Sequence, residues 1–135
     1  MDYFFTKKVE LSFDNSILKI TEELAKEGFG LLTRIDLDKK FKEKLNIDFR
    51  KYAILGFCNP SFAYKAIQVD DKIGIMLPCN VILQELDENI SEISVVNPIS
   101  VMQPVNNPSL DSFGIEVTEK LLKALNKLSD FEKKD

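Results

Sequence analysis

Residues 80–96, NVILQELDENISEISVV, give the clearest indication of the fold. Two β-like runs, 80–86 and 90–96, flank the turn-forming triplet 87–89, and the second run alternates apolar with polar residues. A short turn between two strands joins them as an antiparallel hairpin. The sequence therefore predicts antiparallel pairing of these runs. This argues against a doubly wound parallel sheet, for which the chain also lacks the glycine-rich turn after a strand.

Further strands are predicted on the N-terminal side of this hairpin. Residues 3–12, 31–35 and 52–57 are apolar runs, alternating or continuous, of roughly strand length. From residue 73 to 86 the chain is again β-like, but Pro78 lies inside this run and donates no ladder hydrogen bond. Pro78 is therefore expected at a sheet edge, at a bulge or at a break between two strands.

Helices are predicted between and after these strands. The first has an apolar face, a possible N-cap at Asp14, Asn15 or Ser16, and a left-handed stop at Gly28. The other helices are expected to begin at Asp36, at Asn59-Pro60 and at Asn107-Pro108. The element order β-α-β-α-β-α-β-β-α predicts an α+β fold, a two-layer sandwich in which helices cover a mainly antiparallel sheet. The last helix is expected to pack over the hairpin.

Composition excludes several kinds of function. No linker or repeat interrupts the chain, so residues 1–135 are expected to form one domain. Lys and Arg total 18 against 22 Asp and Glu, and the modest net charge of -4 argues against general nucleic-acid binding, which needs a basic face. No apolar run reaches the length of a signal peptide or a membrane span. The protein is expected in the cytoplasm, with neither nucleic acid nor membrane as a partner.

The absence of histidine narrows the chemistry further. It excludes Ser-His-Asp and Cys-His nucleophile systems and most zinc sites. No metal or cofactor is expected. Acid–base chemistry would fall to Asp, Glu, Lys, Tyr or Cys.

Two triplets, CNP at 58–60 and PCN at 78–80, contain both cysteines of the chain. In the first, asparagine is a preferred N-cap and proline a preferred first helical residue, so Cys58 would precede a helix start. The helix dipole and unpaired amides there could favour a thiolate or hold an anion. A plainer interpretation stays open. Asn-Pro is sufficient as a capping device, and cysteine often behaves as a small buried hydrophobe.

The two triplets are expected to meet at one end of the sheet. If the strand ending at Phe57 lies beside Leu77, the Cα atoms of Cys58 and Cys79 come within about 10 Å of each other. The thiols could then form a disulfide, although no Cys-x-x-Cys redox motif is present. A zinc site would need further ligands from nearby carboxylates or a second subunit. Neither triplet carries a base or a phosphate loop that would identify a reaction.

Four segments together resemble a known family: GFGLLT at 28–33, FKEKL at 41–45 with DFR at 48–50, ILGFCNP at 54–60 and GIMLPCNV at 74–81. The resemblance covers about residues 10–103 and is to the domain-of-unknown-function family numbered 302. It implies a small two-layer α+β domain with an antiparallel sheet and a homodimer, and it implies no activity. The motif residues that carry over, and that form the candidate ligand-binding site, are Gly56, Cys58, Asn59, Pro60, Pro78, Cys79 and Asn80.

The function expected first is that of a binding or accessory protein, not an enzyme. Its small pocket around the triplets would take an anionic or thiol-reactive ligand. One alternative is a thiol-dependent enzyme or sulfur carrier that uses Cys58 or Cys79. Another is a purely structural dimerisation module.

Overall fold

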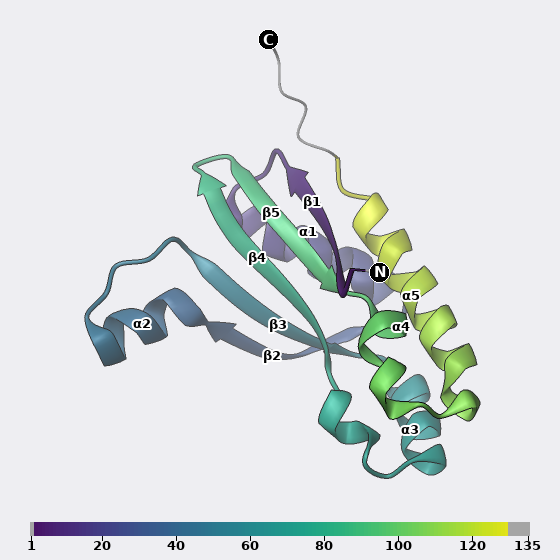
Figure 1. The fold of residues 1–135 in the computed structure, drawn as a ribbon. Helices are drawn as coiled ribbons and strands as arrows, with labels where there is room; N and C mark the ends of the chain where they lie inside the picture. The colour runs from purple at the N-terminus through teal and green to yellow at the C-terminus, as the bar shows by residue number, and fades with distance from the viewer. Residues whose placement is uncertain (1, 130–135) are drawn as a thin grey trace.

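The computed structural model describes residues 2–129. Five antiparallel strands form one sheet in the order β1-β5-β4-β3-β2 (Figure 1). The strands are β1 (Phe4–Val9), β2 (Gly30–Asp36), β3 (Tyr52–Cys58), β4 (Cys79–Asp87) and β5 (Ile90–Val96). The helices are α1 (Phe13–Lys26), α2 (Leu37–Leu45), α3 (Pro60–Val69), α4 (Pro98–Val101) and α5 (Asp111–Asn126). The predicted α+β class with a mainly antiparallel sheet is confirmed, and no described helix is long and apolar enough to cross a membrane.

Strands β4 and β5 form the predicted hairpin. Val81 lies opposite Val95 and Leu83 opposite Ile93, which confirms the predicted antiparallel pairing. The turn is shorter than the predicted triplet, because Asp87 pairs with Ile90 as the last residue of β4. A register shift before Asp87 allows this extra pair.

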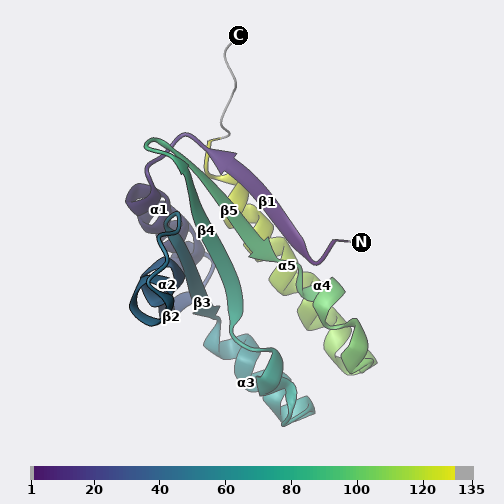
Figure 2. The same cartoon turned by 60° about the vertical axis from the view of Figure 1, so that its left-hand side comes forward.

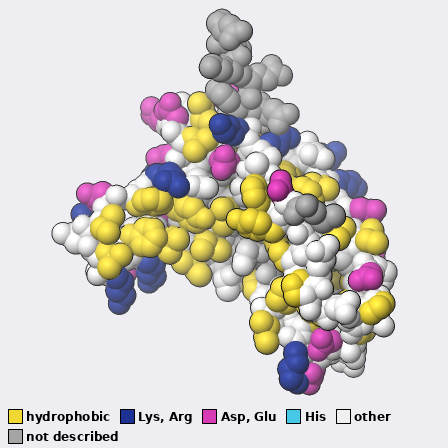
Figure 3. Space-filling view, in the orientation of Figure 1, with side chains coloured by type: hydrophobic (Ala, Val, Ile, Leu, Met, Phe, Trp, Pro, Cys, Tyr) yellow, Lys and Arg dark blue, Asp and Glu magenta, His cyan; other side chains and the backbone are white. Residues whose placement is uncertain are grey.

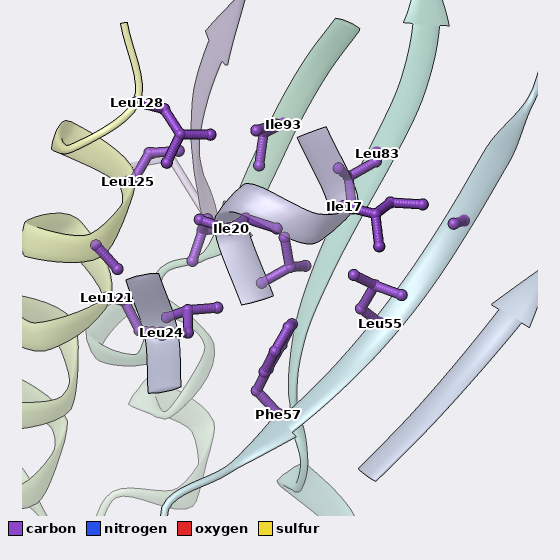
Figure 4. Close-up of a cluster of buried hydrophobic side chains, with 14 of the residues drawn as sticks. Ile17, Ile20, Leu24, Leu55, Phe57, Leu83, Ile93, Leu121, Leu125 and Leu128 are labelled. Carbon is purple, nitrogen blue, oxygen red and sulfur yellow. The ribbon is translucent and has the colours of Figure 1, made fainter. Parts of the chain in front are cut away.

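Helices α1 and α5 cover one face of the sheet (Figures 1 and 2). The last helix was predicted to cover the hairpin. In the structure α1 shares this role, because its Ile17, Ile20 and Leu24 enter the same core. Figure 4 shows side chains from both helices and the sheet gathered in one cluster. The buried cluster consists of Val9, Phe13, Ile17, Ile20, Leu24, Phe29, Ala53, Leu55, Phe57, Val81, Leu83, Ile93, Val95, Leu121, Ala124, Leu125 and Leu128.

The first helix begins earlier than predicted. Ser12, and not Asp14, Asn15 or Ser16, is its N-cap, and the Ser12 hydroxyl accepts a hydrogen bond from the Asn15 amide at 3.1 Å. The earlier start makes Phe13 helical and buries its ring in the core, a gain that the local cap preferences do not reveal. After the helix, Gly28 adopts a φ of 89°, as its role in a left-handed stop predicts.

Four other segments differ from their predicted form. Residues 73–76, expected to be β-like, form a 3₁₀ turn, and β4 begins only at Cys79, after the proline that cannot donate to the ladder. Asn107 does act as a cap, but of a 3₁₀ turn at Pro108–Leu110 that precedes α5. The short helix α4, directly after β5, was not predicted, and strand β1 is shorter than residues 3–12.

The other face of the sheet carries an apolar band. The register aligns Ile35, Ile54 and Ile82 across β2, β3 and β4, on the side opposite the buried Leu55. Beside this row, Phe49 contacts the rings of Phe41 in α2 and Tyr52 in β3. Figure 3 shows hydrophobic side chains gathered across this face of the molecule. We define the apolar band as Ile35, Phe41, Phe49, Tyr52, Ile54 and Ile82.

Candidate functional site

A cavity of about 300 Å³ lies at the end of the sheet where β3 stops and β4 starts. Figures 1 and 2 place α3, α4 and the first turns of α5 at this end. The cavity separates the main core from a second buried cluster, formed around Ala66, Ile73 and Leu110. Its lining consists of Phe29, Phe57, Cys58, Asn59, Phe62, Ala63, Ala66, Ile73, Ile75, Met76, Leu77, Pro78, Cys79, Asn80, Val96, Pro98, Val101, Met102, Leu110, Phe113, Gly114 and Val117.

The first triplet forms the junction between β3 and α3. Cys58 is the last strand residue, Asn59 is an extended N-cap with φ -98° and ψ 105°, and Pro60 opens the helix. The Asn59 side-chain oxygen accepts the Phe62 amide at 3.4 Å, and its backbone carbonyl accepts the Ala63 amide at 2.9 Å. The predicted helix start at Pro60 is confirmed. Cys58 therefore lies directly before a capped helix N-terminus.

The second triplet lies beside the first. Cys79 is the cross-strand partner of Phe57, and Asn80 is the partner of Gly56. Paired Cα atoms in an antiparallel sheet are at most about 5.5 Å apart. One further residue adds about 3.8 Å, so the Cα atoms of Cys58 and Cys79 lie no more than about 9 Å apart. The predicted convergence of the two cysteines at one sheet end is confirmed, and both thiols are free.

Gly56 and Gly28 make room for the two triplets. A Cβ at Gly56 would overlap the Thr33 hydroxyl and would lie 2.6 Å from Cγ of Pro78. A Cβ at Gly28 would lie 2.9 Å from the Asn59 side-chain nitrogen. Both separations are well below van der Waals contact. The glycines therefore act by allowing Pro78 and Asn59 to pack against the backbone.

Five of the seven predicted site residues line the cavity, and two do not. Cys58, Asn59, Pro78, Cys79 and Asn80 contribute to its wall. Gly56 lies beneath Pro78, and Pro60 begins α3 without reaching the lining.

The cavity carries no charged side chain. Apart from the two cysteines, no residue of its lining is ionisable. Burial, and secondarily the neighbouring Cys58, raise the pKa of the Cys79 thiol to about 11. Cys79 is therefore a neutral thiol at neutral pH. Within residues 2–129, moreover, no three His, Cys, Asp or Glu side chains gather closely enough to hold a metal ion.

Most of the wall comes from residues that the sequence analysis did not assign to the site. Phe113 and Val117 belong to the last helix, which was expected to cover the hairpin, and they form an apolar stripe at helical spacing together with Leu110, Leu121, Leu125 and Leu128. The stripe divides, however: Leu121 and Leu125 enter the main core, whereas Leu110 and Phe113 join the second cluster. Phe62 and Ala66, four residues apart on α3, face the same cavity. The available signal was this apolar spacing, but helical spacing alone does not say what a face covers.

Comparisons with known proteins identify a family and a similar solved structure, and neither description names an activity. The family described as "Domain of unknown function DUF302" matches residues 5–128. Among solved structures, the fold resembles one described as an uncharacterized conserved protein DUF302 from Bacillus stearothermophilus. The TM-score is 0.87 at 25% identity, over 96% of this chain and 100% of that chain. No curated protein matches the chain significantly.

Proposed function

Because the chain belongs to DUF302, a family of domains of unknown function, we propose its function from the site: a binding or accessory protein whose small-molecule ligand occupies the cavity around the two triplets. One observation carries the proposal. Two separate triplets bring both thiols and two asparagines to one cavity of about 300 Å³ that is otherwise almost wholly apolar. Ligand pockets commonly combine apolar walls with a few polar groups, in volumes of roughly 300–1,000 Å³.

The lining favours binding over catalysis by a thiol. A thiol-dependent enzyme needs an activated thiolate and usually an adjacent base. No Asp, Glu, Lys, Arg, His or Tyr side chain lines the cavity, and the raised pKa of Cys79 keeps that thiol protonated. The role left for Cys79 is that of a neutral contact. Cys58, at the helix start, is the thiol on which an enzyme or sulfur carrier would have to depend.

The apolar band favours a second proposal, a homodimer. Ile35 and Phe49 remain 44% and 40% exposed, and β2, to which Ile35 belongs, is an edge strand of the sheet. Exposed apolar residues on an edge strand invite pairing with another chain. A second copy of the chain that covered the band would bury both the exposed apolar side chains and the edge strand β2. This proposal concerns assembly and is compatible with ligand binding in the cavity.

We also propose a cytoplasmic location. Two unbridged thiols, close enough to interact, are typical of a reducing compartment.

Native mass spectrometry of gently purified protein tests both proposals in one experiment. The expected spectrum shows a dimer that retains added small-molecule mass. Ala63→Leu, which fills the cavity from α3, should lose the added mass, whereas Gln68→Leu, on the same helix but outside the lining, should keep it. If the spectrum shows no added mass, a metabolite screen by melting temperature decides. The binding proposal fails if no compound raises the melting temperature of the wild type by more than it raises that of Ala63→Leu.

A matched pair of variants tests the dimer. Ile35→Glu places a charge in the band and should yield monomers. Leu18→Glu, on α1, changes a residue that is 67% exposed outside the band and should leave the dimer intact. A dimer that survives Ile35→Glu contradicts the assignment of the interface.

A further inference from the structure

The cavity's own lining restricts the chemistry of its ligand. We infer that the cavity takes an uncharged aromatic molecule and discriminates against anions. This inference rests on the proposed binding function and adds the ligand class.

The absence of charge in the lining is the first argument. An anion that enters an apolar cavity loses its hydration and needs a cation or several hydrogen-bond donors in return. No Lys or Arg lines this cavity. An anion would therefore be desolvated without a compensating charge.

The N-terminus of α3 offers little replacement for a cation. Helix starts bind anions through their free backbone amides. Here Pro60 has no amide hydrogen, the Phe62 amide donates to the Asn59 side chain, and the Ala63 amide donates to the Asn59 carbonyl. The cap that positions Asn59 thus occupies two of the donors that an anion would use, and Ser61, whose amide completes this turn, does not belong to the cavity lining. Cys79, protonated at neutral pH, adds only a weak thiol donor.

Aromatic rings and thioether sulfur atoms lie among the aliphatic side chains of the remaining wall. Phe29, Phe57, Phe62 and Phe113 all line the cavity, and the rings of Phe62 and Phe113 meet edge to face, with centroids 6.4 Å apart. Aromatic pairs in such arrangements gain energy beyond simple area burial. Met76 and Met102 also line the cavity, and thioether sulfur makes favourable contacts with aromatic rings. A planar unsaturated ligand would use both kinds of contact.

The polar side chains of the lining all come from the two triplets, where β3 ends and β4 begins. Cys58, Asn59 and Asn80 come from the strand ends, whereas the phenylalanines of α3 and α5 come from the helices. Few polar groups placed together orient a ligand that has one polar end. A hydroxyl, carbonyl or amide on an aromatic skeleton fits this distribution.

Isothermal titration calorimetry with three probes tests the inference. The probes are a naphthalene alcohol, the naphthalene carboxylate of the same skeleton, and the fully saturated analogue of the alcohol, each titrated near pH 7. The alcohol should bind to the wild type. The carboxylate should bind at least about a hundredfold more weakly than the alcohol. Removing an unpaired charge from water costs several kcal/mol, and each 1.4 kcal/mol corresponds to about a tenfold change in affinity. The saturated alcohol should bind about three- to tenfold more weakly than the aromatic one.

The variants separate a failure of the ligand class from a failure of the site. Ala63→Leu should reduce binding of the naphthalene alcohol at least tenfold, and Gln68→Leu should not change it. If the carboxylate binds as well as the alcohol, and Ala63→Leu removes both, the inferred neutrality is wrong while the proposed site stands. Equal affinity for the saturated alcohol overturns the aromatic preference. If no probe binds, or Ala63→Leu has no effect on binding, both the ligand class and the proposed cavity function are overturned.

Discussion

Gly56→Ala is the substitution that most directly probes how the site is built. The added methyl would lie 2.6 Å from Cγ of Pro78 and would overlap the Thr33 hydroxyl, whereas carbon atoms pack best at about 3.5–4.0 Å. The Thr33 side chain can rotate away, but the Pro78 ring has no such freedom. Strands β3 and β4 must therefore separate locally by about 1 Å. Overpacking of this kind typically costs about 1–3 kcal/mol, and we expect a loss of about 2 kcal/mol in the free energy of unfolding.

Urea denaturation measures this loss. With an m value of about 1–3 kcal/mol per molar urea, the midpoint should fall by about 1 M. Gly30→Ala is the matched control, because a Cβ at Gly30, on the neighbouring strand, meets no atom within 4 Å. The control should stay within about 0.5 kcal/mol of the wild type. A Gly56→Ala variant as stable as the control would refute the packing of Pro78 against Gly56, and with it the reason for a glycine at that position.

Three further predictions concern the triplets. Asn59→Ala should lower the free energy of unfolding by about 1 kcal/mol through loss of the cap; an unchanged melting curve would contradict the hydrogen bond to the Phe62 amide. The pKa of Cys79 is raised from 9.0 to about 11. Its neutral form therefore stabilises the folded state below pH 9, and this contribution is lost as the pH rises through 11. Relative to Cys79→Ala, the wild type should lose about 2–3 kcal/mol between these pH values in paired urea titrations, and parallel curves would exclude the burial of Cys79. Iodoacetamide should alkylate Cys58 faster than Cys79 at neutral pH, as rates in Cys58→Ser and Cys79→Ser report; the reverse order would contradict the enclosed position of Cys79.

Local chemistry predicted the parts of the fold that depend on neighbouring residues. The alternation in β5 and the turn before it identified the hairpin, and Asn-Pro identified the start of α3. The convergence of Cys58 and Cys79 was predicted from two apolar runs that each carry a triplet, although the expected neighbour of Phe57 was Leu77, and the structure pairs Phe57 with Cys79. At the hairpin turn and at the start of α3, the interactions that determine the structure lie within a few residues of one another along the chain.

The features that the sequence did not predict depend on interactions between segments that are distant along the chain. Ser12 caps α1 in preference to three later candidates because Phe13 must reach the core, a requirement that the capping residues do not encode. The division of the α5 stripe between the main core and the cavity depends on where α3 and α4 pack. The absence of charged side chains from the site likewise depends on which segments line the cavity together, and these segments are distant along the chain.

Whether a ligand binds in the cavity at the triplets can be measured from backbone amide chemical shifts of isotopically labelled protein during titration with the naphthalene alcohol. A ligand in the cavity should cause saturable shifts at lining residues such as Cys58, Cys79 and Phe113 and leave the amides of the apolar band unchanged. Shifts confined to the band, or no saturable shift at the lining while the alcohol remains in excess, would contradict it.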